Sequence, residues 1–202
     1  MPELSKRTET FTDSVIRRMT RISNQYGAVN LSQGFPDFEP PRELLDRLAE
    51  VSNEDFHQYS ITWGAQNFRE ALARKQSHLM GVDIDPNENI VVTCGSTEAM
   101  MAAMMTVTNP GDKVIVFSPF YENYGADTIL SGAEPIYVPL YPPEFNFNPD
   151  ELEAAFKPNT KAVFGETIAN PALTVLDIEK FAKAAHAHGV PLIVDNTFAT
   201  PV

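Results

Sequence analysis

Four short stretches of the sequence place polar or aromatic side chains directly after apolar runs that are typical of buried strands. In chain order these stretches are Gly95-Ser96-Thr97, Tyr121, Asn170-Pro171 and Asp195. If the strands are parallel, their carboxyl ends lie at one edge of a sheet, which is where ligands bind in open α/β sheets. The four stretches are therefore the candidate ligand site.

Ser96 and Thr97 stand at the predicted turn between a strand and a helix in "VVTCGSTEAMMAAMM". The first turn of a helix exposes backbone N–H groups and the positive end of the dipole, so an anion can dock there, and two hydroxyls add donors. The alternative is that Ser96 or Thr97 caps the helix, with Glu98 interacting favourably with the dipole. The pattern is neither a Walker A loop nor a dinucleotide-binding glycine fingerprint.

Asp195 is the sharpest single feature, because it ends the apolar run "VPLIVD". A partly desolvated carboxylate is costly unless it meets a cation or a hydrogen-bond donor. A protonated pyridine nitrogen is one such partner, and a helix cap or a salt bridge at the sheet edge is the alternative. Tyr121 is suited either to stacking on a planar ring or to core packing. Asn170 is suited either to donating to a ligand oxygen or to forming a turn before Pro171.

Composition narrows the classes of function. The chain has 202 residues and a net charge of -12, which argues against binding to nucleic acid or to anionic membranes. The single cysteine excludes an intrachain disulfide framework, and the histidines lack metal-binding spacing. No apolar stretch reaches the roughly 18 residues that span a bilayer, and the N-terminus has no apolar core of signal-peptide type. We therefore expect a cytoplasmic protein with neither nucleic-acid nor membrane partners.

The elements that position the candidate site follow from hydrophobic periodicity. Helices are expected over 14–22, 41–53, 66–81, 148–160 and 176–189, and residues 88–112 are expected to form a strand, a tight turn and a helix in that order. Strands are expected within 88–94, 112–118, 133–140 and 161–167, and over 190–196, with a loop following the second of these strands. The four methionines between residues 100 and 105 are expected in the core, and Asn148 or Asp150 is expected to cap the helix that follows.

The alternation of strands and helices from Asn89 onward indicates an α/β fold. Short connections between strands and helices favour a mainly parallel sheet with both faces covered by helices. The predicted fold is a three-layer α-β-α sandwich.

The order of these features resembles the large domain of the fold-type I pyridoxal-phosphate (PLP) enzymes. From the N-terminus to about Lys161 the chain resembles class I aminotransferases, on the motifs "VNLSQGFPDFEPP", "HQYSITWGAQNFREALA", "VVTCGSTEAM" and "NPGDKVIVFSPFYENY". From about Lys161 onward, "KAVFGETIANPALTVLDIEKFAKAAHAHGVPLIVDNTFATP" is similar to the Cys/Met-metabolism PLP family, in particular the O-acetylhomoserine sulfhydrylase type. The resemblance therefore implies a chimeric join near residue 161.

The resemblance implies pyridoxal 5'-phosphate as the cofactor. Ser96 and Thr97 would bind its phosphate, and Tyr121 would stack on its pyridine ring. Asn170 would hydrogen-bond the phenolic oxygen of the ring. Asp195 would pair with the ring nitrogen and keep it protonated, which makes the ring an electron sink.

Three further residues take roles from the resemblance. Thr197 would support the cofactor. Tyr59 would reach the phosphate of a neighbouring subunit, which implies a homodimer with shared sites. Gly34 would lie beside the substrate carboxylate.

The resemblance also implies a Schiff-base lysine, but no lysine of the chain matches its sequence context in either family. No catalytic residue is therefore assigned, and we expect a truncated chain. Residues 1–40 would form an N-terminal arm and small-domain segment, and residues 41–202 a partial PLP-binding large domain. The C-terminal domain would be absent.

The implied reaction is amino-group transfer between an amino acid and a 2-oxo acid, with little or no activity for this chain alone. One alternative is a PLP-dependent carbon-sulfur lyase or sulfhydrylase, which the last 40 or so residues favour. Another is a non-catalytic fragment of the PLP fold. A nucleotide-binding α/β domain is disfavoured, because the glycine fingerprint and the ribose-binding acid are missing.

Overall fold

The computed structural model describes residues 3, 5–9, 13–34, 36–170 and 173–200. It divides the chain into two compact units, one formed by residues 1–10 with 63–202 and the other by residues 11–62. The division expected near residue 40 concerned the domains of the resembled family, and it stays a prediction.

The smaller unit contains two helices, α1 (Val15–Tyr26) and α2 (Arg42–Val51). The helix α1 ends at Gly27, whose φ of 59° is a left-handed conformation that glycine adopts without strain. Both helices were expected from the sequence, and both predictions are confirmed.

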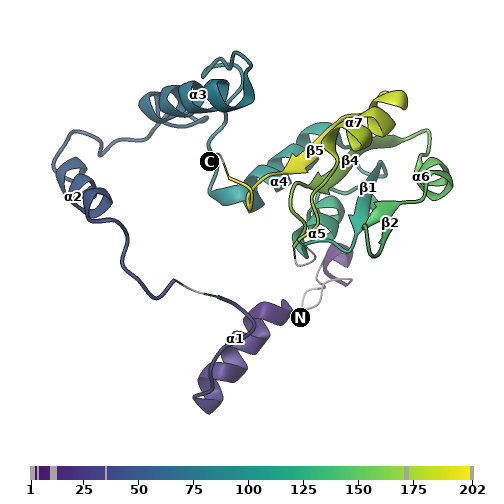
Figure 1. Ribbon diagram of the computed structural model, residues 1–202, viewed down its shortest axis with the longest axis horizontal. Helices are drawn as coiled ribbons and strands as arrows, with labels where there is room; N and C mark the ends of the chain where they lie inside the picture. The colour runs from purple at the N-terminus through teal and green to yellow at the C-terminus, as the bar shows by residue number, and fades with distance from the viewer. Residues whose placement is uncertain (1–2, 4, 10–12, 35, 171–172, 201–202) are drawn as a thin grey trace. The chain divides into compact units, whose positions relative to one another are not determined.

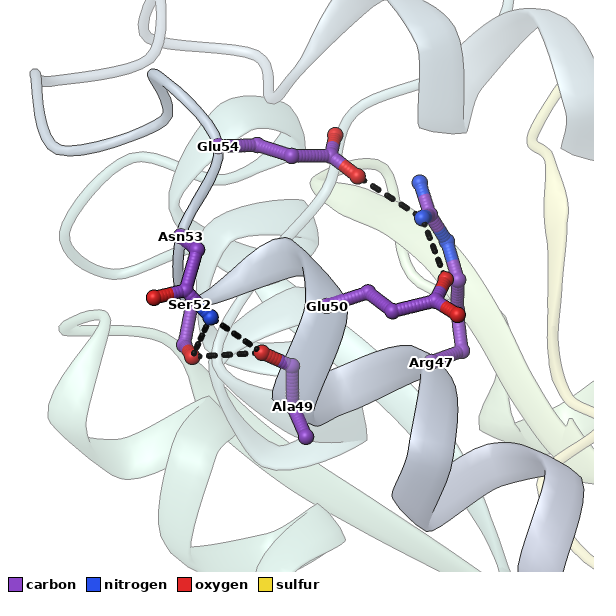
Figure 2. A network of polar contacts seen from close by, with 6 residues as sticks. All are labelled: Arg47, Ala49, Glu50, Ser52, Asn53 and Glu54. Atoms are coloured by element: carbon purple, nitrogen blue, oxygen red, sulfur yellow. Dashed lines mark hydrogen bonds and ion pairs between the residues drawn. The ribbon is translucent and has the colours of Figure 1, made fainter.

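Polar contacts close the C-terminal end of α2, as Figure 2 shows. The Nη1 atom of Arg47 donates to Glu50 Oε2 at 2.9 Å and to Glu54 Oε1 at 2.7 Å. The side-chain amide of Asn53 donates to the carbonyl of Ala49 at 2.9 Å. Arg47 and Glu50 are exposed, so these ion pairs order the helix end locally and add little to global stability.

The larger unit is built on a five-stranded sheet in the order β3-β2-β1-β4-β5. Its strands are β1 (Lys113–Ser118), β2 (Glu134–Tyr141), β3 (Asn146–Phe147), β4 (Thr160–Glu166) and β5 (Leu192–Asp195). β1 pairs in parallel with β2 and β4, and β4 pairs in parallel with β5, whereas the short β3 is antiparallel to β2. The prediction of a mainly parallel sheet is confirmed.

Helices precede and connect these strands. They are the short 3-10 helix η1 (Lys6–Thr8), then α3 (Gln66–Met80), α4 (Gly95–Val107), α5 (Asn123–Leu130), α6 (Pro149–Ala155) and α7 (Ile178–Ala187). Asn148 caps α6 by accepting the N–H of Asp150 at 2.9 Å, as expected. In the described part of the chain, no helix is both long and apolar enough to cross a bilayer.

The core consists of two apolar clusters, one on each face of the sheet. Figure 1 shows the sheet and the helices that surround it. Along β1, Ile115 and Phe117 join a cluster with residues of α6 and α7, while Val114 and Val116 join a cluster with residues of α4 and α5. This alternation is the period-two pattern of a strand that is buried on both faces. The three-layer α-β-α arrangement is therefore confirmed.

The strand expected within residues 88–94 does not form. Val92 donates its backbone N–H to Trp63 O at 3.1 Å, but no strand of the described chain pairs with this segment. An apolar run needs a ladder partner to become a strand, and here it packs against a loop instead. Gly64 makes this close approach possible, because a Cβ atom built there would lie 2.5 Å from the Val92 side chain.

The segment after β1, expected as a loop, contains α5. The buried face of α5 includes Tyr124, Gly125, Asp127 and Thr128, which do not give the apolar periodicity of a core helix. A Cβ at Gly125 would meet the hydroxyl oxygen of Tyr137, so a larger residue at this position needs the Tyr137 side chain to shift.

The methionines of α4 do not all enter the core. Met100 and Met104, one helical turn apart, are buried against the sheet, whereas Met105 is exposed. The expectation that all four are core residues is therefore wrong for Met105. The helix presents only one stripe to the sheet, and Met105 lies off that stripe.

A buried arginine fastens the segment that carries α3. Arg69 is fully buried, and its Nε atom donates to the carbonyl of Gly64 at 3.1 Å. Its Nη1 atom donates to Asn87 Oδ1 at 3.2 Å and to the carbonyl of Pro86, and its Nη2 atom donates to Gln66. Neutral acceptors thus satisfy the guanidinium, and they tie the start of α3 to the loop that follows it.

Asp127 carries a buried side-chain oxygen that lacks a hydrogen-bond partner among the described residues. This atom is Oδ2, and burial raises the pKa of the Asp127 carboxyl to about 6. An unfolded aspartate has a pKa of about 3.9. Between these two values the folded chain binds more protons than the unfolded chain, so this group lowers stability as the pH rises.

We predict that Asp127→Asn raises the melting temperature at pH 7.5 by about 3 °C, because it removes a buried charge. The advantage over wild type should shrink as the pH falls through 6. It should vanish below about 4, where the Asp127 carboxyl of wild type is neutral in both the folded and the unfolded chain. Thermal melts followed by circular dichroism across this range measure the difference. The exposed Asp83→Asn is the matched control, and an equal gain in that variant would contradict the prediction.

Candidate functional site

The N-terminus of α4 forms the first part of the site. Cys94 is its N-cap residue and Gly95, with φ of 79°, is its first residue. The side chain of Glu98 accepts the backbone N–H of Cys94, as the acidic residue of a capping box does. The expectation that Ser96 or Thr97 caps the helix is therefore wrong, because the left-handed glycine starts the helix before them.

Ser96 and Thr97 lie instead in the exposed first turn of α4. Among the described residues, neither backbone N–H has a hydrogen-bond acceptor. The Thr97 hydroxyl accepts from the side-chain amide of Asn123 at 3.0 Å. The turn therefore presents two hydroxyls and the positive end of a helix dipole, which is the donor set that an anion requires.

A cavity of about 390 Å³ adjoins this turn. Its lining comes from the start of α4, the loop after β1 and the loops after β4 and β5: Ser96, Thr97, Tyr121, Glu166, Asn170, Asp195, Thr197 and Phe198. The structure thus brings together six of the site residues predicted from the sequence. The four stretches singled out by their positions after apolar runs meet at the carboxyl edge of the sheet, as expected.

The carboxylate of Asp195 is held by two donors. Its Oδ2 atom accepts from the Tyr124 hydroxyl at 3.1 Å, and its Oδ1 atom accepts from the backbone N–H of Thr197 at 2.9 Å. The Asp195 side chain is half-buried, so these bonds offset part of the cost of removing it from water. No helix cap or salt bridge uses this carboxylate in the described chain, so neither alternative to a ligand role accounts for it.

Tyr124 is the main site residue that the sequence did not reveal. Its ring is buried against Phe164, with ring centroids 4.5 Å apart. Burial raises the pKa of its hydroxyl far above the ordinary value, and the charges of Asp195 and Glu166 raise it further. The hydroxyl is therefore a permanent donor at physiological pH. The aromatic run "SPFYENY" contained the signal, but nothing in it distinguished Tyr124 from Tyr121.

Glu166 is a second carboxylate in the cavity, also unassigned from the sequence. Its Oε2 atom accepts the backbone N–H of Asn170 at 3.0 Å, which fixes the turn that carries the Asn170 side chain. Burial raises the pKa of Glu166, and the charge of Asp195 adds to the rise, whereas the bond from Asn170 opposes it.

Tyr121 lines the cavity and is half-buried. Its ring meets that of Tyr124 edge to face at 6.0 Å, and it packs against the cluster under α4 and α5. Core packing is therefore observed for Tyr121, and its stacking on a ligand ring stays a prediction. Gly34 and Tyr59 belong to the smaller unit, and their predicted roles stay predictions.

Among the described residues, no group of three or more histidine, cysteine, aspartate or glutamate side chains is arranged to hold a metal ion. The cavity instead combines an anion-binding helix start, an aromatic ring and a carboxylate held by neutral donors. This combination suits a planar heterocycle that carries a phosphate at one end and a protonated nitrogen at the other.

Comparison with known proteins agrees with this geometry. The family model for aminotransferase class I and II matches residues 26–202. The chain belongs to the class I and II aminotransferase family. This match includes residues 161–202, so it does not distinguish that segment from the rest of the chain. The similarity of this segment to the Cys/Met-metabolism family and the chimeric join near residue 161 stay predictions.

Curated relatives support the assignment. The chain is 37% identical over 188 residues to a methionine aminotransferase of Escherichia coli strain K12, covering 92% of this chain and 49% of that protein. It is 32% identical over 197 residues to a probable N-succinyldiaminopimelate aminotransferase of Mycobacterium tuberculosis, covering 95% of this chain and 50% of that protein. The chain therefore spans about half the length of these relatives.

Solved structures agree on the fold. The methionine aminotransferase structure from E. coli superposes with a TM-score of 0.88 at 34% identity, covering 97% of this chain and 52% of that one. The N-succinyldiaminopimelate aminotransferase structure from M. tuberculosis gives a TM-score of 0.87 at 32% identity, covering 96% and 52%. Class I aminotransferases use pyridoxal 5'-phosphate as their cofactor.

Glu98 places a negative charge beside the anion-binding turn, which gives a prediction with a definite sign. We predict that Glu98→Gln binds pyridoxal phosphate about threefold more tightly than wild type, because like-charge repulsion is removed while the amide oxygen still accepts the Cys94 N–H. Isothermal titration at low ionic strength measures the change. A weaker affinity in this variant would show that the phosphate does not dock at this turn.

Proposed function

We propose that this chain is the cofactor-binding segment of a pyridoxal-phosphate-dependent aminotransferase, which transfers an amino group between an amino acid and a 2-oxo acid. The single observation that carries the proposal is the cavity at the carboxyl edge of the sheet. Separate segments contribute its hydroxyls, its aromatic ring and its carboxylate, and those segments are joined only by the fold.

The residues of the cavity fit the cofactor at each end. Ser96 and Thr97 offer hydroxyl and backbone donors to a phosphate at the start of α4. At the other end, Asp195 offers a carboxylate whose present donors, the Tyr124 hydroxyl and the Thr197 N–H, are neutral. A protonated ring nitrogen would be a positively charged partner for this carboxylate, which neither of its present donors is.

When bound, pyridoxal phosphate supplies an electron sink for carbanion chemistry at the amino acid. The protein residues hold the ring in place and tune its charge. Asp195 would keep the ring nitrogen protonated, Asn170 would donate to the phenolic oxygen, and Tyr121 would stack on the ring. Tyr124 and Thr197 orient the Asp195 carboxylate and limit its rotation.

We predict that Asp195→Asn weakens pyridoxal phosphate binding by about 10- to 100-fold, because a charge-assisted hydrogen bond to the ring nitrogen is lost. Titration calorimetry with the purified chain measures the affinity. Asp177→Asn is the matched control, since Asp177 lies on a neighbouring cavity and its role as the α7 cap survives as the amide. Unchanged affinity in Asp195→Asn would refute the proposed ring position.

Transamination needs a lysine amine in the pocket, and no lysine is among the residues that line the cavity. We predict that the 202-residue chain alone shows no measurable transaminase turnover, and that borohydride reduction with pyridoxal phosphate labels several surface lysines instead of one. Peptide mass spectrometry locates the labels. Stoichiometric labelling of one lysine, accompanied by turnover, would contradict this prediction.

A second reaction, carbon-sulfur bond cleavage or sulfhydrylation, is supported by the sequence of residues 161–202. Product analysis on an active protein that carries this segment distinguishes the two reactions. Transamination yields a 2-oxo acid and an aminated cofactor, whereas lyase chemistry releases a thiol or sulfide together with ammonia.

We further infer a homodimer in the cytoplasm for the parent enzyme. The support is the resemblance that assigns Tyr59 to the phosphate of a neighbouring subunit, together with the acidic composition and single cysteine. Sedimentation of the parent enzyme measures whether it is a dimer. Cofactor affinity measured with and without Tyr59→Phe then tests whether that affinity depends on dimerisation.

A further inference from the structure

Two carboxylates stand side by side in the cavity. Glu166 ends β4 and Asp195 ends β5, and the two residues are partners in the parallel register of these strands. Both line the same cavity. The ladder continues beyond them, because Thr167 donates its backbone N–H to Asp195 O at 2.9 Å. The pair is therefore fixed by backbone geometry and does not depend on loop conformation.

One tyrosine adjoins both carboxylates. Tyr124 is 2% exposed, its hydroxyl donates to Asp195 Oδ2 at 3.1 Å, and Tyr124 lines a neighbouring cavity together with Glu166, whose charge, like that of Asp195, raises the pKa of the hydroxyl. A phenol has a single proton, so a bond that it gives to one carboxylate is withheld from the other. Burial keeps this proton on the phenol, and the competition therefore persists at physiological pH.

Within the described part of the chain, no cationic side chain lines the cavities beside the pair. Lysine, arginine and histidine are missing from the lining of this cavity and from that of the neighbouring one, which Glu166 and Tyr124 also line. The other acids on the neighbouring cavity, Glu144 and Asp177, are exposed. The negative charge of the pair must therefore be met by hydrogen bonds or by a cationic ligand.

We propose that Glu166 is a positioning residue of the cofactor pocket, which competes with Asp195 for the Tyr124 hydroxyl proton and so sets the negative charge that Asp195 presents to a protonated ring nitrogen. This inference rests on the proposed function and deepens it. When Tyr124 donates to Glu166, Asp195 keeps its full charge for the ligand. When Tyr124 donates to Asp195, part of that charge is neutralised.

The inference assigns opposite signs to two variants. Glu166→Gln removes one negative charge and frees the Tyr124 proton for Asp195, so attraction for a ring cation decreases. Tyr124→Phe removes the donor from Asp195, so attraction for a ring cation increases. The glutamine oxygen can still accept the Asn170 N–H, so the turn that carries Asn170 keeps its tether.

The test compares two probes: pyridoxal phosphate, and its carbocyclic analogue in which a C–H group replaces the ring nitrogen. The measured quantity is the ratio of the two dissociation constants from calorimetric titration at pH 7.5. We expect this ratio, analogue over pyridoxal phosphate, to fall about fivefold in Glu166→Gln and to rise about twofold in Tyr124→Phe. In Glu144→Gln, which removes the same charge from an exposed position, the ratio should stay at the wild-type value.

The other outcomes are decisive in different ways. If both probes lose affinity equally in Glu166→Gln, or if the ratio falls as much in Glu144→Gln, Glu166 has only a structural or long-range role and the inference is overturned. If Glu166→Gln does not fold, Tyr124→Phe decides alone, since a fall in its ratio contradicts the competition. If wild type binds both probes equally, or binds neither, the proposed function itself fails.

Discussion

The parallel ladder between β4 and β5 is the constraint on which the site depends. It places Glu166 beside Asp195 in register. The ladder continues to Thr167 through a backbone hydrogen bond of 2.9 Å. Because side chains alternate along a strand, a slip of one residue would turn Asp195 away from Tyr124 and toward the opposite layer. The burial of Val163 and Phe164 on opposite faces of β4 opposes such a slip. Core packing and site geometry are therefore set by the same register.

Much of this arrangement follows from the sequence because the signals are local. Apolar runs flanked by turns fixed the strands that became β1, β4 and β5, and residues at their ends had to meet at one edge once the strands were parallel. That rule brought Tyr121, Asn170 and Asp195 into one cavity, whereas Ser96 reaches the same cavity from the start of α4, and the apolar run before α4 forms no strand. The resemblance to aminotransferases added roles for these residues, but their proximity needed only topology.

The remainder could not be predicted because it depends on tertiary partners. Helix α5 buries Gly125, Asp127 and Thr128, so its periodicity carries no apolar signal, and its glycine is explained only by the Tyr137 hydroxyl that lies against it. The apolar run at Val92 gave the opposite error, a predicted strand that does not form. Its β-branched residues favour a strand, but no neighbouring strand of the described chain pairs with it. Tyr124 was missed for the same reason as α5, because its function comes from the residues it faces.

The charge distribution of the site gives its two ends different physical characters. At the start of α4 the attraction for an anion comes from backbone dipoles and hydroxyls, and Glu98 opposes it from the same turn. At the ends of β4 and β5 the attraction for a cation comes from two full charges within a partly buried wall. Full charges act more strongly than partial ones at equal distance. If the proposed cofactor binds here, the carboxylate end would therefore determine which ring binds and in which protonation state, while the helix end would determine where the phosphate rests.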